Sequence, residues 1–398
     1  MKDKIIPFLL GLFSFSSLLS YWSVRLLHAP CLVEICAIPL LYYYRHKIKI
    51  PQTDFISVIL FMLLGIFVGL LNPVYSFMEI LPIARCFMLG ALAFIISKNN
   101  NIFKDIDGLY AFCFGAFMGD LLNAYILMSS ILGTKFDKQY AVDINIIFSV
   151  LWVILTILYK GSKYLIAIFI LVPLLSFISV SRGVSTFFLI GVILAFILKI
   201  HQRPSKIILV TAFLSVSYLT LSSLYVNNEE TVRKFSPSMH FRMYKKLRTY
   251  GQNNIDGGRI APYVWAGNHL TYYAVPRGFL GKKFLNKMDG ENTPMMAPWD
   301  SAYMELLYTF GFLPLVIILL IYLYKLYSCY MLYIRTGELI FAASCVMLAL
   351  LFVEHVFTYG LIRSPFMVTC NGGFLGFIWR ITNQPTTLVG NLIQEKND

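Results

Sequence analysis

Long apolar runs constrain the fold of this chain more than any other feature of its sequence. Twelve runs are long enough, at about 1.5 Å per residue, to cross roughly 30 Å of hydrocarbon as helices. They lie near residues 5–24, 29–44, 54–72, 77–97, 108–132, 144–160, 164–181, 183–199, 206–226, 302–325, 337–357 and 364–380. Only 13% of the 398 residues are charged, too few to cover a water-soluble globule of this size. The sequence predicts an all-α, polytopic transmembrane helical bundle of about 12 helices.

Basic residues between the runs predict the orientation of the bundle. Sixteen Lys and Arg residues fall on one side, in short connectors and at the termini, against five on the other: Arg25, Lys135, Lys138, Arg182 and Arg363. The positive-inside rule then puts both termini in the cytoplasm of a bacterial cell, in its inner membrane. Three segments follow: spans one to nine at 1–226, a periplasmic loop at 227–301, and spans ten to twelve with a cytoplasmic tail at 302–398.

The predicted periplasmic loop is too long for a simple connector, and loops of this size commonly carry function. It holds eleven basic and six acidic residues, so its natural partner is anionic. Nucleic acid is not expected, because the other basic residues are spread over connectors between spans. Short helices are expected inside the loop, one of them after Gly257-Gly258-Arg259, where Pro262 and apolar residues at helical spacing follow.

Three loop-side residues are candidates for chemistry, each with a structural alternative. Arg182, beside Ser181, is either an interfacial side chain that reaches the headgroups or a fork for a phosphate. Arg259, at the start of a short helix, is either a solvated charge or part of an anion site. Asp300, before the helix predicted from Ala302, is either its N-cap or a general base.

Ionisable residues inside the predicted spans are further candidates, because charge is costly in hydrocarbon. Among them are Arg85, Asp120, Glu354 and His355. Arg85 and Asp120 can pair across helices in a purely structural role, and a histidine such as His355 is more often hydrogen-bonded than catalytic. The sequence contains no nucleotide-binding motif and no cluster with metal-ligand spacing, so neither a cofactor nor a metal is expected.

The order of these features resembles the O-antigen polymerase and O-antigen ligase superfamily of bacterial surface-polysaccharide enzymes. Ser181-Arg182-Gly183 is similar to the family's Ser-Arg segment. Gly258-Arg259, followed by Tyr263, Trp265 and Asn268 and then by Pro276-Arg277-Gly278-Phe279-Leu280-Gly281, is similar to its loop core. Asp300-Ser301, nine residues, Gly311, two residues and Pro314 keep the spacing of a ligase motif, with Asp300 in the place of the ligase histidine. That replacement favours a polymerase.

The resemblance implies a metal-independent, inverting glycosyltransferase of the GT-C-like type. It would move a growing glycan from undecaprenyl diphosphate onto a hydroxyl of a second lipid-linked repeat unit, with Arg182 and Arg259 on the diphosphate and Asp300 as the base. Tyr263, Trp265 and Trp299 would either stack on sugars or pack at the membrane interface. The other residues expected to bind substrate are Ser181, Arg277, Arg85 and His355.

The expected partners are the lipid-linked donor and acceptor, the lipid bilayer and a chain-length regulator protein. Two other functions stay open. One is an O-antigen ligase, which transfers the glycan to lipid A core. The other is a flippase or transporter of lipid-linked oligosaccharide, which needs charged residues along a path between helices.

Overall fold

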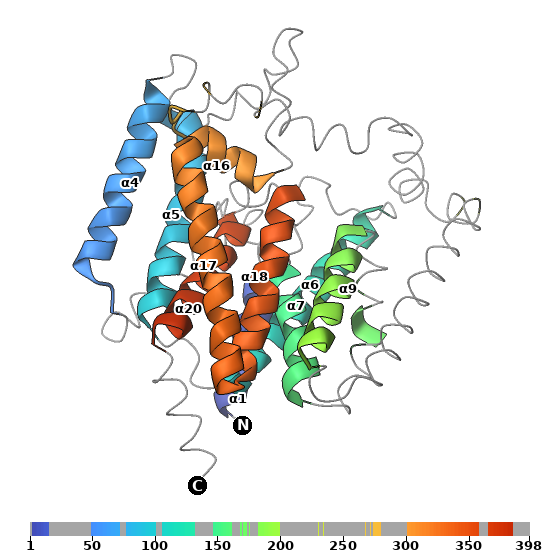
Figure 1. Cartoon of the computed structure of the whole chain (residues 1–398). Coiled ribbons are helices and arrows are strands. Elements are labelled where there is room, and N and C mark those ends of the chain that lie inside the picture. Colours follow the sequence, from blue (N-terminus) through green and yellow to red (C-terminus); the bar gives the residue numbers. More distant parts are fainter. Residues whose placement is uncertain are drawn as a thin grey trace. The chain divides into compact units, whose positions relative to one another are not determined.

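The structure is a computed structural model of the whole chain, and every regular element in its described part is a helix (Figure 1). It describes residues 2–15, 49–71, 77–100, 106–131, 146–160, 182–199, 274–279, 301–357 and 365–384, together with single positions at 168, 170–172, 175, 230, 234, 267 and 271. The all-α prediction is therefore confirmed for these residues.

Most of the predicted runs coincide with helices. The helices are α1 (Lys2–Phe15), α4 (Gln52–Leu70), α5 (Phe77–Asn99), α6 (Ile106–Ile131), α7 (Ile146–Leu155) with the π-helical turn η2 (Thr156–Lys160), α9 (Arg182–Lys199), α16 (Ala302–Phe310), α17 (Phe312–Thr336), α18 (Leu339–Phe357) and α20 (Pro365–Asn383). The runs predicted at 29–44 and 206–226 lie outside the described residues, as does most of 164–181. By length and composition, α4 and α17 can each cross a membrane.

The span predicted at 302–325 is wrong. The run at 302–325 is not a single helix, because α16 ends at Phe310, Gly311 is its C-cap, and α17 starts at Phe312. Gly311 has a φ of 85°, a left-handed backbone angle that glycine adopts without strain. The chain changes direction there, so that α16 lies across the upper end of α17 (Figure 1). The longer helix runs on to Thr336, eleven residues beyond the predicted end.

The chain divides into two compact units, each built from separated segments. The first unit holds α1, α6, α7, η2, α9 and the start of α18. Trp152 of α7 is buried against Phe117 of α6, with ring centroids 4.6 Å apart. Helices α1 and α6 approach closely, because a Cβ at Gly11 or Gly115 would overlap the partner's backbone. Small residues allow such contact between apolar helices.

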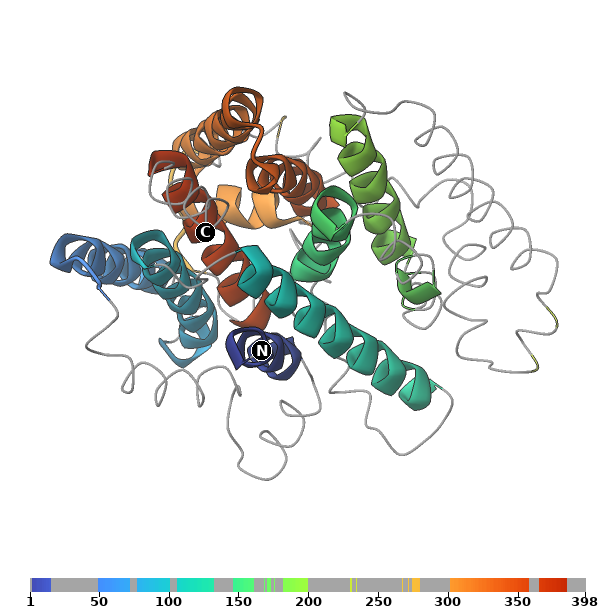
Figure 2. The ribbon, with the colours of Figure 1, turned by 90° about the horizontal axis from the view of Figure 1, so that it is seen from below.

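The second unit holds α4, α5, α16, most of α17, the end of α18 and α20. Figure 2 shows α20 lying along α5, the pair with the most extensive packing of the unit. Gly372 of α20 meets the backbone of Gly90, and Gly376 meets the backbone of Phe94. Helix α4 also packs against α5. The Asp54 carboxylate of α4 lies 3.0 Å from Lys98 Nζ of α5.

Contacts fix the relative direction of the helices within each unit. In the second unit, Gly90 and Phe94 of α5 meet Gly372 and Gly376 of α20 in the same order, so these helices are parallel. In the first unit, Lys4 pairs with Asp107 and Gly11 packs near Ala116, so α1 and α6 are also parallel. Helices α4 and α5 are antiparallel, because Asp54 near the start of α4 meets Lys98 near the end of α5.

Candidate functional site at helix α16

Helix α16 is short and almost wholly buried, although it carries polar side chains. All its residues except Leu306 and Phe310 are buried, and Glu305 is only 2% exposed. Its apolar side chains pack with Met62 of α4, Ile83 and Ala84 of α5, and Leu315 of α17. A nine-residue helix gains little stability from its own hydrogen bonds, so this packing holds α16 in place.

The N-terminus of α16 is capped by Ser301. Its hydroxyl accepts a hydrogen bond from the Met304 N–H and donates one to the main-chain oxygen of His355, 3.2 Å away. The alternative role for Asp300, that of the N-cap, therefore belongs to its neighbour. Asp300 itself lies outside the described residues. Because Ser301 bonds to the end of α18, the chain enters α16 next to the ionisable pair Glu354 and His355.

Two tyrosines surround the His355 ring. The Tyr303 ring meets it edge-on with centroids 5.8 Å apart, and the Tyr322 ring lies 6.3 Å from it. The Tyr303 hydroxyl donates to the Phe352 carbonyl oxygen at 3.0 Å. In contrast, the Tyr322 hydroxyl and His355 Nε2 are buried and have no hydrogen-bond partner within the described part of the chain.

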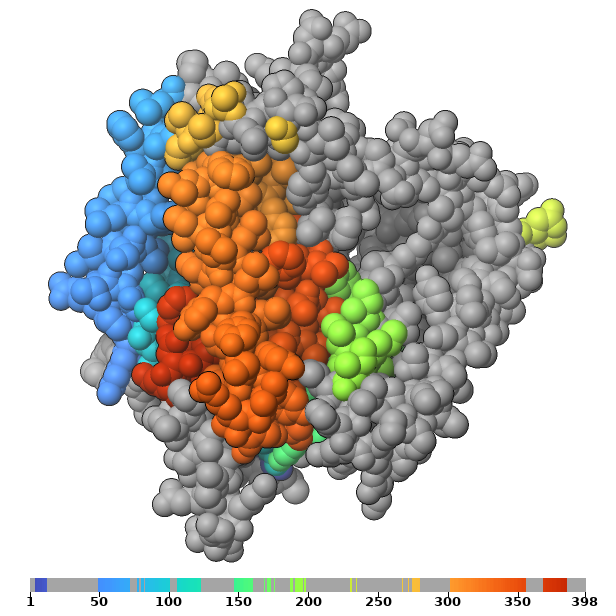
Figure 3. Space-filling model, in the orientation of Figure 1, coloured from blue at the N-terminus to red at the C-terminus, as the bar shows by residue number. Residues whose placement is uncertain are grey.

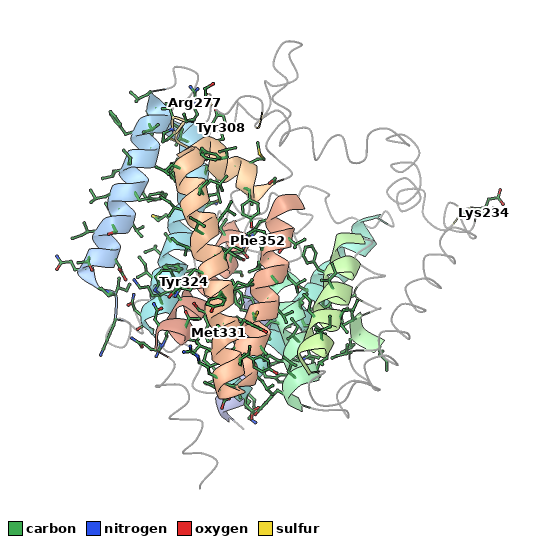
Figure 4. All side chains as sticks on the ribbon, in the orientation of Figure 1. Lys234, Arg277, Tyr308, Tyr324, Met331 and Phe352 are labelled. Carbon is green, nitrogen blue, oxygen red and sulfur yellow. The ribbon has the colours of Figure 1, made fainter. Side chains whose placement is uncertain are left out.

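The opposite end of α16 holds the loop segment around Arg277. The Arg277 N–H donates to the Tyr308 carbonyl oxygen at 3.2 Å, and the Gly278 N–H donates to that of Thr309 at 3.1 Å. Both acceptors are carbonyls of the last helical turn, which have no partner inside the helix. Figure 4 shows Arg277 and Tyr308 side by side at the top of the view. The predicted loop core thus folds back onto the helices at this point.

Phe279 anchors this segment in α4. Its side chain is 0% exposed and its N–H donates to the Gly65 carbonyl oxygen at 3.2 Å. A Cβ on Gly65 would come within 2.5 Å of the Phe279 ring, and a Cβ on Gly69 within 2.8 Å of the Phe279 carbonyl oxygen. Glycines four residues apart usually receive a second helix. Here they contact Phe279 of the loop instead. The centroid of its ring also lies 5.1 Å from that of Phe87.

The other predicted site residues are distributed as follows. Arg85 follows Ala84, which packs in the α16 cluster, and its side chain is partly buried. Arg182 is the first residue of α9, in the first unit. Asp120 of α6 accepts a hydrogen bond from Ser149 of α7. The positions outside the described residues are Ser181, Arg259, Tyr263, Trp265, Trp299 and Asp300. Of the predicted set, the structure brings His355 and Arg277 to the two ends of α16.

Sequence reasoning missed several polar residues of this unit. Tyr303 and Tyr322 lie inside the apolar run 302–325 and Ser301 directly precedes it, and uncharged hydroxyl groups at such positions give no charge signal. Lys325, the last residue of the run predicted at 302–325, lies within α17 and is 6% exposed. The helix continues for eleven residues beyond Lys325, so its position inside α17 can be recognised only when the end of the helix is known.

Around α16 the described side chains supply one imidazole, two carboxyl groups and three tyrosines in an apolar setting. Such a set can hydrogen-bond the hydroxyls of a sugar and exchange a proton with one of them. Over the described ranges, no three His, Cys, Asp or Glu side chains gather in a way that could hold a metal ion. No protein family, curated protein or solved structure matches this chain.

Proposed function

We propose that the protein is a polytopic inner-membrane glycosyltransferase that polymerises a lipid-linked surface polysaccharide. The proposal rests on the contacts that the chain makes where it enters α16. Ser301, the residue after the predicted base Asp300, donates to the main-chain oxygen of His355. The His355 ring lies 6.3 Å, between centroids, from that of Tyr322, and both His355 Nε2 and the Tyr322 hydroxyl are buried. A basic, aromatic loop therefore leads directly into a buried polar pair suited to an acceptor hydroxyl.

Helix directions support the proposed membrane topology. Two parallel spans must be separated by an odd number of crossings. Seven predicted spans separate α5 from α20, and three separate α1 from α6. Both parallel pairs therefore agree with spans that cross the membrane in alternating directions. The first of those three is the run at 29–44. Without it, α1 and α6 would be antiparallel.

The depth of the site supports a substrate held at the outer surface. Phe279 meets α4 at Gly65 and Gly69. These glycines are about 20–26 Å from Gln52 at roughly 1.5 Å per residue, within the last third of the helix. With the loop outside, this is the outer third of the membrane. A donor with its lipid tail in the bilayer would present its diphosphate and sugar at that level.

In the proposed reaction, Asp300 takes the proton of the acceptor hydroxyl as its oxygen attacks the anomeric carbon of the donor. The bond from that carbon to the diphosphate oxygen breaks, and undecaprenyl diphosphate leaves with the bonding electrons. Arg182 and Arg259 stabilise the charge that grows on the leaving oxygens. Attack opposite the leaving group inverts the anomeric centre. His355 and Tyr322 orient the acceptor through hydrogen bonds.

The test compares two neighbouring residues in a strain whose own gene is deleted, with polymer ladders as the readout. Asp300→Asn keeps the size of the side chain and removes the base, so ladders should fall by about 100-fold or more at equal protein abundance. Ser301→Ala removes the cap and should cost about 1 kcal/mol of stability while ladders persist. Ladders within about tenfold of wild type in Asp300→Asn would remove the base from the mechanism.

The acceptor distinguishes the alternatives. Purified enzyme with lipid-linked repeat units should give a ladder on undecaprenyl diphosphate. Single transfer to lipid A core would instead indicate the ligase. Movement of lipid-linked units across vesicles without any new glycosidic bond would indicate the flippase.

A further inference from the structure

Residues 277–279 of the loop, which we call the strap, connect α16 to α4. The strap donates main-chain hydrogen bonds in two directions. Its first two N–H groups donate to carbonyls in the last turn of α16, and the Phe279 N–H donates to the Gly65 carbonyl oxygen of α4 at 3.2 Å. Figure 3 shows the described part of the loop in yellow, next to α4 in blue and to the orange helices. The strap thus links two helices that are far apart in the sequence.

Four phenylalanine rings pack together at the strap. Three of them surround Phe310, the last residue of α16, with centroids 5.0 Å (Phe61 of α4), 5.4 Å (Phe87 of α5) and 6.4 Å (Phe279) from its own. Phe279 is the member that the strap contributes, and it is 0% exposed. Aromatic pairs at such distances add to the stabilisation that burial gives. Phe279 therefore fills the space where α4, α5 and α16 meet.

Helix α16 is short enough and packed closely enough to move as one rigid body. Its nine residues span about 13 Å, and its helical hydrogen bonds hold both ends in a fixed relation. All but two of these residues are buried. A closely packed interior transmits a displacement instead of absorbing it. A shift at the strap should therefore reach the opposite end of α16.

The opposite end of α16 belongs to the acceptor site of the proposed reaction. Ser301 donates to the main-chain oxygen of His355 at 3.2 Å, and the Tyr303 ring meets the His355 ring edge-on at 5.8 Å. The Tyr303 hydroxyl also donates to the Phe352 carbonyl oxygen. These contacts set the place of α16 relative to the end of α18. Their geometry depends on where the strap holds the other end of the helix.

We propose that Phe279 is a positioning residue for the acceptor site and acts on it through α16, without touching the substrate. The inference rests on the proposed function, since it concerns the site assigned there to the acceptor. The Phe279 side chain has no polar atom and lies in a notch of α4, where a Cβ on Gly65 would come within 2.5 Å of its ring. It therefore acts by shape alone. A misplacement of about 1 Å that originates far from the reacting atoms can lower turnover by about 100-fold.

The experiment replaces the aromatic anchor with a covalent one, in the full chain without its seven native cysteines. Phe279→Cys removes the ring and should lower polymer ladders about tenfold or more at equal protein abundance. Gly65→Cys then adds a second thiol in the space that the ring has left. The two backbones are hydrogen-bonded to each other, close enough for a disulfide. Oxidation of the double variant should restore the ladders, and reduction should remove them again.

Two further variants separate positioning from stability. Phe279→Leu keeps an apolar side chain in the notch and should retain most of the activity. Phe94→Ala is the matched control, because Phe94 of α5 packs on Trp379 of α20, at 6.0 Å between centroids, and not on the strap. It should lower the Tm and leave the ladders normal. With purified enzyme and a soluble acceptor analogue, Phe279→Ala should raise the KM for the acceptor more than the KM for the donor.

Three results would overturn the proposal: normal ladders in Phe279→Cys, low ladders after the disulfide has formed, or equal losses of ladders in Phe279→Cys and Phe94→Ala. If Phe279→Cys alone does not accumulate, the oxidised double variant decides the outcome. Cross-linking is measured as the loss of free thiols and needs no activity, so two failures are distinct. Thiols that pair while wild type gives no ladders contradict the proposed function. Wild-type ladders that the disulfide does not restore contradict the role of Phe279 alone.

Discussion

Gly278 and Gly337 share a left-handed backbone, with φ of 74° and 68°, but differ in what surrounds them. A Cβ at Gly278 would overlap the backbone of Gly69, whereas a Cβ at Gly337 would meet nothing within 4 Å. Gly337→Ala should therefore cost only the strain of the backbone, about 1 kcal/mol. Gly278→Ala adds overpacking against α4, and should cost about 3 kcal/mol or more. Thermal unfolding in detergent measures both, and equal losses would show that the loop does not dock on α4.

Tyr303 and Tyr322 form a second matched pair, distinguished by their hydroxyl groups. The Tyr303 hydroxyl is bonded to the Phe352 carbonyl oxygen, so Tyr303→Phe should cost about 1 kcal/mol of stability. The Tyr322 hydroxyl has no partner in the described structure, so Tyr322→Phe should leave the Tm unchanged. If this hydroxyl meets the acceptor, Tyr322→Phe should lower polymerisation about tenfold. Normal ladders together with a lowered Tm in Tyr322→Phe would make its role structural.

At the scale of single residues, charge is the signal that a sequence offers. It identifies candidate residues inside apolar runs, where ionisable side chains are rare. The sequence distinguishes His355, because an ionisable group inside an apolar run is costly, and the residue lies in the buried polar set at α16. Tyr322 carries no such signal, since tyrosine is frequent in this chain. Its partnership with His355 depends on how α17 and α18 pack, which periodicity cannot supply.

At the scale of helices, the apolar runs predicted most elements but not their breaks. The run at 302–325 reads as one span because Gly311 is flanked by apolar residues on both sides. Glycine occurs both inside membrane helices and at their ends, and only its backbone angle separates the two cases. The same ambiguity applies to Gly65 and Gly69, which would have predicted a helix partner for α4 rather than Phe279.

The contact between α5 and α20 gives a prediction from adjacent glycines. A Cβ at Gly372 would overlap the backbone of Gly90, whereas one at Gly373 would lie 3.6 Å from Ser97 Oγ, an ordinary contact. Gly372→Ala should therefore destabilise the protein by about 1–3 kcal/mol. Gly373→Ala should be neutral or slightly stabilising, because alanine favours the helix. The Tm values of the two variants test this, and a similar fall in both would indicate that α20 packs elsewhere.

At the scale of the whole molecule, the proposed topology assigns the two ends of α17 to opposite sides of the membrane. At 25 residues, α17 is about 37 Å long, enough to cross the hydrocarbon with a turn to spare. Sixteen against five basic residues predict Thr336 inside and the loop before α16 outside. Thr336 is exposed, so a cysteine there can react once a reagent reaches it.

Single cysteines in a background without the seven native ones test this topology. In intact spheroplasts, an impermeant maleimide should label Gly290→Cys in the loop and leave Thr336→Cys unlabelled. Permeabilisation should then expose Thr336→Cys, which shows that its protection came from the membrane and not from burial. Labelling of Thr336→Cys before permeabilisation, with Gly290→Cys protected, would reverse the orientation. That result would also contradict the proposed reaction. A polymerase of this kind uses a donor presented on the periplasmic side, and a loop in the cytoplasm would not reach it.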